Sequence, residues 1–181
     1  LGTLTFDVSS GNAFEGAYAL TVDANTGDVA VADPIATSSG TLTKSGSGTL
    51  TLSAANTYTG ATTISTGVVA ISNNTALGTT AAATTVANNA TLSISGGLTA
   101  MAEALTVSGD GVTVSSAEVG AIRSTSGSNT LTGLVTLAAA AEVQADAGTL
   151  TFDVSSGNAF EGAYALTVDA NTGDEIGRAH V

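Results

Sequence analysis

The sequence of 181 residues has no cysteine, one proline, one histidine and only three lysine and arginine residues together. Without cysteine no disulfide can form, which fits a chain that must stay unfolded while it crosses an oxidising periplasm. The scarcity of cations leaves a formal net charge of −12. This charge argues against nucleic acid or an anionic membrane as partner, because each phosphate contact requires a cation. No apolar run approaches the roughly 18 residues of a membrane helix.

Aromatic and charged residues are also scarce, at 4% and 10% of the sequence, whereas about 25% of residues are charged in a usual soluble protein. The interior must therefore consist of Leu, Val, Ile and Ala, while Gly and Thr replace Lys and Glu on the surface. The single proline, Pro34, is too little for a proline-rich stalk. A chain of this length can still bury a core of ordinary size.

A long block of the sequence occurs twice. Residues Gly2 to Asp28 recur without any change as Gly148 to Asp174, so the two position numbers differ by 148 − 2 = 146. Such repetition is typical of solenoids and fibres. Because the chain opens on Leu1 and the second copy breaks off inside the motif, we interpret the sequence as a piece of a longer repetitive protein, with residues 1–174 as a single solenoid fragment.

The last seven residues, 175–181, differ in character from the rest. Glu-Ile-Gly-Arg-Ala-His-Val is the translation of a common sequencing-library adapter, so we interpret this segment as a non-native tail and exclude it from the fold. His180 and Arg178 leave the functional argument with it. Only Lys44 and Arg123 then remain as cations for contacts with a partner.

Polar and apolar residues alternate with a period of two over many short segments, which predicts strands with one buried face. The clearest are 3–8, 20–23, 49–52, 91–94 and 112–114. Turns rich in Gly, Asn and Ser separate them at intervals too short for helices. Only 81–83, 100–105 and 138–141 lean towards helix, and none is long enough to form a stable helix alone. We expect the following to point inward: Leu4, Phe6, Val8, Leu50, Leu52, Leu92, Ile94, Leu150 and Phe152. We expect Thr3, Thr5, Thr49 and Thr51 to face solvent.

A shorter similarity lies inside the large repeat. Asn56 to Gly60 (NTYTG) reappears as Asn129 to Gly133 (NTLTG), and 129 − 56 = 73 is half of 146, so the larger unit can be read as two diverged halves. Short strands with such turns can close as a sandwich, a barrel or a parallel β-helix. Long-range repetition favours the solenoid, in which each coil stacks only on its neighbours. At roughly 20 residues per coil, the fragment holds about eight or nine coils, with Asn and Thr ladders at equivalent turns.

Residues 40 to 71 carry a family pattern: Lys44-x-Gly46-x-Gly48-x-Leu-x-Leu, then Asn56-x-Tyr58-x-Gly60 and a threonine-rich strand. This pattern resembles the passenger-associated β-strand repeat of bacterial autotransporters, and residues 105 to 152 resemble neighbouring passenger segments, with Leu131 in place of the tyrosine. The resemblance implies a right-handed parallel β-helix. It also implies export across the outer membrane to the cell surface, where the segment serves as the stalk of an adhesin.

Candidate sites for metals or catalysis are weak. Asp23-x-Asn25-x-Gly27-Asp28 suggests a calcium loop, but its twelfth position, where a bidentate glutamate is needed, is Pro34. We therefore predict an Asn-Gly turn there and in the copy at 169–174, and a plain turn at 109–111. Without a usable histidine, no serine in the fragment can be activated as a nucleophile. We predict no catalytic residue, no cofactor site and no metal site.

Two further groupings have an ordinary and a functional interpretation. The carboxylate pairs Asp7 with Asp23 and Glu15 with Asp28 could serve glycoside hydrolysis, although a solvated acidic surface is the favoured interpretation. The aromatic residues could stack on a sugar, but we expect them to pack at a corner of the coil, where aromatic rings bury much area. These aromatic residues are Phe14, Tyr18, Phe160 and Tyr164.

We therefore predict a non-catalytic stalk or spacer of a bacterial surface protein, whose partners are neighbouring repeats of the same chain and host or surface glycans or proteins. One alternative is a β-helix enzyme acting on polysaccharides, which is disfavoured because an acidic polymer requires cationic contacts. A second alternative is a threonine-rich solenoid that binds ice. Its spacing is irregular, since Thr3-x-Thr5 and Thr49-x-Thr51 do not recur in every coil.

Overall fold

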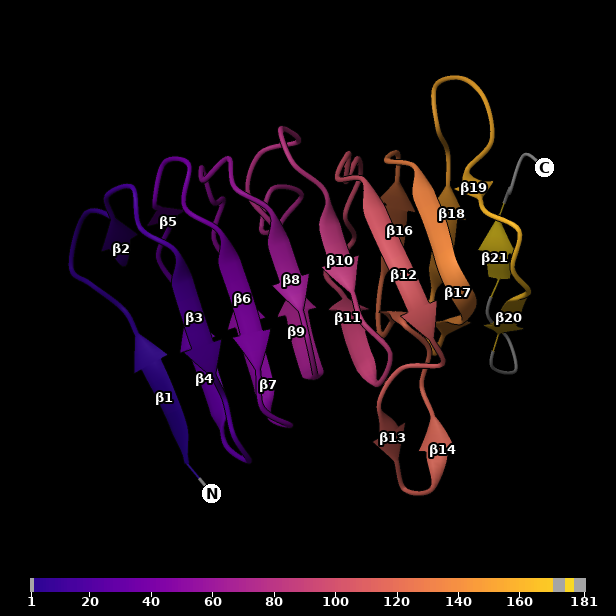
Figure 1. The fold of residues 1–181 in the computed structure, drawn as a ribbon, viewed down its shortest axis with the longest axis horizontal. Coiled ribbons are helices and arrows are strands. Elements are labelled where there is room, and N and C mark those ends of the chain that lie inside the picture. Colours follow the sequence, from indigo (N-terminus) through magenta and orange to yellow (C-terminus); the bar gives the residue numbers. More distant parts are fainter. Residues whose placement is uncertain (1, 171–174, 178–181) are drawn as a thin grey trace.

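The structure is a computed structural model that describes residues 2–170 and the backbone of 175–177. The described residues form only strands and turns, without a helix, and therefore contain no helix that could cross a membrane. Successive strands stack in parallel into an elongated solenoid with the two ends of the chain at opposite ends of the stack (Figure 1). The predicted β-solenoid is thus confirmed, while its right-handed sense stays a prediction.

Each coil crosses three faces in a fixed order, which we name face 1, face 2 and face 3. Face 1 consists of β1 (Thr3–Phe6), β4 (Asp28–Val31), β7 (Thr49–Leu52), β9 (Gly67–Ile71), β11 (Ala90–Ile94), β15 (Ile122–Ser124), the C-terminal part of β17 (Val135–Ala145) and β20 (Leu166–Ala170). Because eight strand segments stack on this face, the described chain makes eight coils.

Face 2 carries shorter ladders, and face 3 is again continuous. Face 2 consists of β2 (Phe14–Glu15), β5 (Ile35–Ala36), β16 (Ser128–Leu131), β18 (Thr149–Phe152) and β21 (Glu175–Gly177). Face 3 consists of β3 (Leu20–Asp23), β6 (Leu42–Ser45), β8 (Thr62–Ile64), β10 (Thr84–Val86), β12 (Leu105–Gly109), the N-terminal part of β17 and β19 (Phe160–Glu161). The long β17 runs around a corner and therefore belongs to faces 3 and 1.

The coil length varies because the corners accept insertions. Along face 1 the paired residues Val29 and Leu50 are 21 positions apart, Leu50 and Val69 are 19 apart, and Leu92 and Ile122 are 30 apart. The longest step contains the hairpin of β13 (Thr113–Val114) and β14 (Ala117–Glu118), which projects from the corner between faces 3 and 1 (Figure 1). This antiparallel hairpin departs from the all-parallel expectation.

The inward positions form one continuous core. Leu50, Leu52, Leu92, Ile94, Leu150 and Phe152 are at most 1% exposed, as the alternation predicted. Leu4 is 58% exposed and Val8 is 39% exposed. Leu4 lies in the first coil, which has a neighbouring coil on one side only, and its side chain borders a hollow of about 320 Å³ with Phe6 and Phe14. Thr3, Thr5 and Thr51 are exposed as predicted, and Thr49 is partly buried.

The three segments with helical leaning form no helix, as their short lengths predicted, and Ala138 to Ala141 lies within β17, where inward and outward positions alternate across the corner. Two local expectations are wrong. Residues 112–114 do not form a half-buried strand, since Thr113 and Val114 are both exposed in the projecting hairpin. Glu175–Gly177 pairs with β18 as β21, so these three residues of the excluded tail do take part in the sheet. Residues 171–174, which belong to the turn predicted at 169–174, and residues 178–181 lie outside the described residues.

Candidate functional site

The lysine of the repeat motif lies in the core. Lys44 is two positions after Leu42 on β6 and takes the same inward orientation, with no exposed surface. Its ammonium group donates to the backbone oxygens of Ser45 (2.9 Å), Gly46 (2.7 Å) and Thr66 (3.2 Å). All three protons of the ammonium are therefore used, and the side chain joins the turns of two successive coils.

Burial and nearby carboxylates act in opposite directions on this lysine. Burial lowers the pKa of Lys44, while Asp23 and Asp28 partly oppose this change. The tight fit also explains a motif glycine, because a Cβ at Gly67 would lie 2.4 Å from the Gly46 oxygen and 2.9 Å from the Lys44 nitrogen. Gly67 also has a φ of +72°, which side chains disfavour. The expectation that Lys44 is available to a partner is wrong.

The motif asparagine connects three coils through backbone groups. The Asn56 side chain is buried, accepts from the backbone N–H of Ile35 (2.7 Å) and donates to the backbone oxygen of Ala76. The related Asn129 accepts from the backbone N–H groups of Gly97 (3.1 Å) and Leu98 (2.9 Å). The similarity between the two motifs therefore marks equivalent positions on face 2. The predicted ladders form between side chain and backbone, since buried backbone groups require partners.

Tyrosine and threonine of the motif begin a buried polar set. The Tyr58 hydroxyl lies 2.7 Å from the Thr62 hydroxyl, and Thr62 stacks directly on Thr84 in face 3. Thr84 donates to Oε1 of Glu103 at 2.9 Å. In the second occurrence of the motif Leu131 replaces the tyrosine and is equally buried. An apolar side chain can thus fill the same place, so the tyrosine position serves packing.

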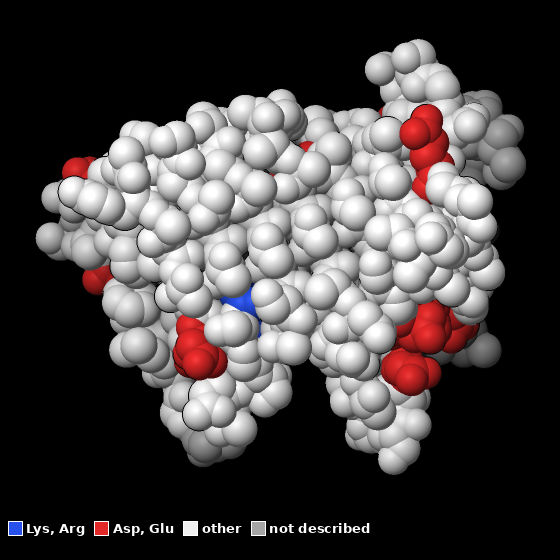
Figure 2. Space-filling view, viewed as in Figure 1, with Lys and Arg blue, Asp and Glu red and all other residues white. Residues whose placement is uncertain are grey.

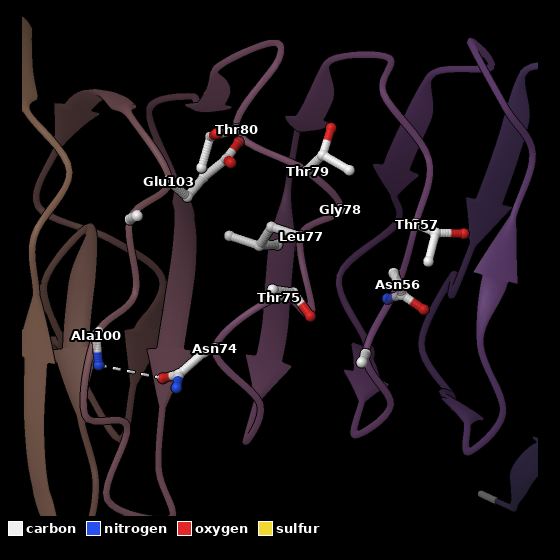
Figure 3. A pocket seen from close by; sticks show the side chains of 12 residues that line it. Asn56, Thr57, Asn74, Thr75, Leu77, Gly78, Thr79, Thr80, Ala100 and Glu103 are labelled. Atoms are coloured by element: carbon white, nitrogen blue, oxygen red, sulfur yellow. Dashed lines mark hydrogen bonds between the residues drawn. The ribbon is translucent and has the colours of Figure 1, made fainter.

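Glu103 carries a buried carboxyl group of which only one oxygen has a hydrogen-bond partner among the described residues. Its side chain is 4% exposed, and its second oxygen, Oε2, has no hydrogen-bond partner among the described residues. Burial raises the pKa of Glu103 to about 7, although the hydrogen bond from Thr84 opposes this. The side chain borders a groove of about 410 Å³ on face 2, with Asn74 and Ala100 on the same side and Asn56 on the other (Figure 3).

Arg123 is also engaged. Its guanidinium lies on Asp146 of the next coil, with Nε to Oδ2 at 2.6 Å and NH2 to Oδ2 at 2.5 Å. Gln144 donates to the other oxygen of the same carboxylate at 2.7 Å. Together with the buried Lys44, this pair leaves neither cation of the described residues unengaged. An acidic polysaccharide substrate would need cationic contacts, and both cations predicted to be available for them are already engaged within the solenoid.

The acidic candidates do not converge. Asp7 follows β1 on face 1 whereas Asp23 ends β3 on face 3, and Glu15 lies on face 2 whereas Asp28 begins β4 on face 1. Asp23 accepts from the backbone N–H of Asn25 (2.9 Å), and Asp28 accepts from that of Thr49 (2.9 Å). These carboxylates stabilise turns, as the turn interpretation of 23–28 predicted. Among the described residues no cluster of three metal-ligating side chains occurs.

One group of carboxylates does lie close together. Burial raises the pKa of Glu142, and the charges of Asp110, Asp169 and Glu118 raise it further. These four residues surround the corner from which the β13–β14 hairpin projects. Figure 2 shows acidic side chains gathered near the base of that projection, while most of the visible surface is uncharged.

The aromatic residues divide into two types in both copies of the repeated block. The ring of Phe14 packs on Phe6 with centroids 5.2 Å apart, and Phe160 packs on Phe152 at 4.6 Å. Corner packing is therefore confirmed for the phenylalanines. Tyr18 and Tyr164 are 76% and 55% exposed, so the prediction that they pack at the corner is wrong.

The burial of Lys44 could have been predicted from its position in the alternation of β6. The alternation Leu42-x-Lys44 places the lysine on the inward side, and three backbone carbonyl groups at the turns compensate for the loss of water around its ammonium. Glu103 could have been recognised in the same way, from Met101-x-Glu103-x-Leu105. Thr84 and the groove, by contrast, come from other coils, and no local pattern indicates them.

Comparison with known proteins gives one result that fits this geometry. Residues 42–71 match the family described as Passenger-associated-transport-repeat. No curated protein matches the chain, and no solved structure matches it. The matched segment contains the inward Lys44, Asn56 and Tyr58 and runs from β6 to β9. Residues 42–71 of this β-solenoid are thus similar to a passenger-associated-transport repeat, and this similarity and the fold fit a fragment of an autotransporter passenger.

Proposed function

We propose that this chain is a non-catalytic spacer in the surface-exposed passenger of a bacterial autotransporter. One observation supports this most directly: the polar residues of the repeat motif point into the stack and bind neighbouring coils. Lys44 donates to backbone oxygens of its own turn and of the next coil. Asn56 accepts from the backbone N–H of Ile35 in the preceding coil and donates to the backbone oxygen of Ala76 in the following coil. Residues used in this way hold the stack together, and a stack of coils can lengthen without changing its cross-section.

The location and the partners follow from the same proposal. The family implies export to the cell surface, and the absence of cysteine suits passage through an oxidising compartment. The partners of the spacer are neighbouring repeats of the same longer chain, and adhesion to glycans or proteins belongs to surfaces that such a stalk carries. The acidic charge of the chain argues against nucleic acid and membrane as partners.

An enzyme acting on polysaccharides is the less supported alternative. The two members of each candidate carboxylate pair lie on different faces, and Asp23 and Asp28 accept from backbone N–H groups. Among the described residues that line the groove, Glu103 is accompanied by no second carboxylate, whereas glycoside hydrolysis requires a pair. Catalysis must be argued from such a site and not from the fold.

Chain length provides the test of the spacer function. The offset between the two copies corresponds to between six and seven coils, and stacked strands are about 4.8 Å apart, so each added unit lengthens the molecule by about 30 Å. Chains of one, two and three units are compared by small-angle X-ray scattering, which should give a constant radius of the cross-section. A maximum dimension that does not grow with the number of units would contradict the proposal, as would hydrolysis of polysaccharides by the purified chain.

A further inference from the structure

The two identical blocks occupy different faces of the solenoid. The first copy places Thr3–Phe6 on face 1, where it pairs with β4. The second copy places the same four residues, Thr149–Phe152, on face 2, where they pair with β16. The later strands shift in the same way, because Phe14–Glu15 lies on face 2 and its copy on face 3. Leu20–Asp23 lies on face 3, and its copy begins β20 on face 1.

The local structure of the two copies is nevertheless the same. The first two strands have the same length in both, and the phenylalanine pairs meet at similar interplanar angles of 58° and 55°. The loop glycines also agree, since Gly11 and Gly157 have φ of +100° and +82°, and Gly16 and its copy have +101° and +125°. The block therefore folds alike on whichever face it begins.

The shift can be counted in coils. Six coils lead from β1 to the face 1 part of β17, and β18 follows one face later, so the offset between the copies corresponds to six coils and one face. The shorter similarity keeps its face, because Asn56 and Asn129 both lie on face 2, three coils apart. The larger unit is thus not simply twice the smaller one in the structure. The corner insertions, above all the β13–β14 hairpin, account for the different lengths.

The second copy is covered by strands of the preceding coil, whereas the first copy has no such cover among the described residues. Strand β16, Ser128–Leu131, covers Thr149–Phe152, and β17 covers the two strands that follow. Leu150 is consequently fully buried, whereas the identical Leu4 is 58% exposed at the end of the stack. The same sequence thus forms a complete interface with one coil and presents the same interface, uncovered, at the N-terminal end.

We propose that this uncovered end is the docking surface for residues 128–147 of a preceding copy of the same unit, and that each successive unit is turned by one face. The interface is the one already present between 128–147 and the second block. Three units then make nineteen coils before a given residue returns to its face. The exposed tyrosine at Tyr18 and Tyr164, and the loop before it, would point in three directions in turn. This inference rests on the proposed spacer function.

Hydrogen exchange tests the docking without any substitution. Peptides covering Thr3–Phe6 and Thr149–Phe152 are identical and overlap in mass, so the 181-residue chain should give two isotopic envelopes of equal size, one fast and one slow. A tandem chain, in which residues 1–147 precede residues 2–181, contains the block three times. We expect one fast and two slow copies there. Two fast copies and one slow copy in the tandem chain, or a single envelope in the shorter chain, would overturn the docking.

Disulfide formation tests the rotation. The chain has no cysteine, and Thr130 pairs directly with Thr151, both partly exposed. Thr130→Cys with Thr151→Cys should form a disulfide on oxidation, since opposite residues of adjacent strands lie within its range of Cα distances. The control pair Arg123→Cys with Thr151→Cys joins faces 1 and 2 and should not. The reverse result would show that the block starts on face 1 in both copies. Lengthening by about 30 Å per unit together with the reverse result would overturn the rotation but leave the spacer function standing.

Discussion

Replacing Glu103 by glutamine should change how the stability of this protein depends on pH. The carboxyl is buried, accepts from the Thr84 hydroxyl at Oε1 and has no described partner at Oε2. Burial raises its pKa to about 7 from the ordinary 4.5. The folded chain therefore holds this proton more tightly than the unfolded chain does. The contribution to stability is fully present below pH 4.5 and is lost as the pH rises to about 7.

The size of the effect follows from the two pKa values. Their difference corresponds to about 3 kcal/mol, at about 1.4 kcal/mol for each pKa unit. This is a large part of the roughly 5–15 kcal/mol that stabilises a typical domain. Glutamine keeps an oxygen that can accept from Thr84 but cannot ionise, so the variant should lack this decline between pH 4.5 and 7. Glu142, whose pKa is also raised, contributes equally to both proteins and cancels in the difference.

The assay is urea unfolding followed by circular dichroism at several pH values between about 4.5 and 8. The free energy of unfolding of Glu103→Gln, minus that of the parent chain, should rise by about 2–3 kcal/mol over this range. Glu161→Gln removes an exposed carboxyl from β19 and serves as the matched control. Parallel curves for Glu103→Gln and the parent chain would refute the reasoning, because they would mean that Glu103 ionises equally easily in both states.

Four further substitutions test the buried lysine, the two copies of the repeated leucine and the ion pair of Arg123. Lys44→Met should lower the free energy of unfolding by about 2–4 kcal/mol, since three backbone carbonyl oxygens lose their charged donor; an unchanged urea midpoint would contradict the assigned role. Leu150→Ala should lower the free energy of unfolding by about 2–5 kcal/mol and Leu4→Ala by less than about 1 kcal/mol, although both change the same position of an identical sequence. Equal losses of stability in thermal unfolding would show that the two leucines are equally buried. Arg123→Ala should cost at most about 1 kcal/mol and less at high salt, because its pair with Asp146 is partly exposed; a large, salt-independent loss would count against this.

Much of the fold follows from short-range features of the sequence. The alternation at 49–52 and 91–94 predicted both the strands and the side chains that point inward, because neighbouring residues of a strand face opposite sides. The coil length of roughly 20 residues, taken from the usual period of solenoids, is close to the observed steps of 19 and 21 residues. The Lys44 to Gly60 pattern predicted the similarity of residues 42–71 to the passenger repeat. These features depend on a few adjacent residues, so the sequence carries them completely.

The candidate site was predictable only in part. The turn at 23–28 and the packing of Phe14 follow from local chemistry, and both agree with the structure. Lys44 and Arg123, by contrast, were predicted from the sequence to be free cations, and no local pattern predicted the groove beside Glu103. The partners of these groups come from other coils and are far away along the chain. Their meeting depends on how many residues each corner contains.

The repeated block separates the two contributions most clearly. Its sequence by itself determines the strands, the glycine turns and the contact between the two phenylalanines, since both copies show them. Only the tertiary structure decides that the first copy starts on face 1 and the second on face 2. It also decides that Leu4 is exposed while Leu150 is buried. The physical reason is that strand formation depends on adjacent residues, whereas the face and the burial depend on the total length of the preceding coils and on whether another coil covers the strand.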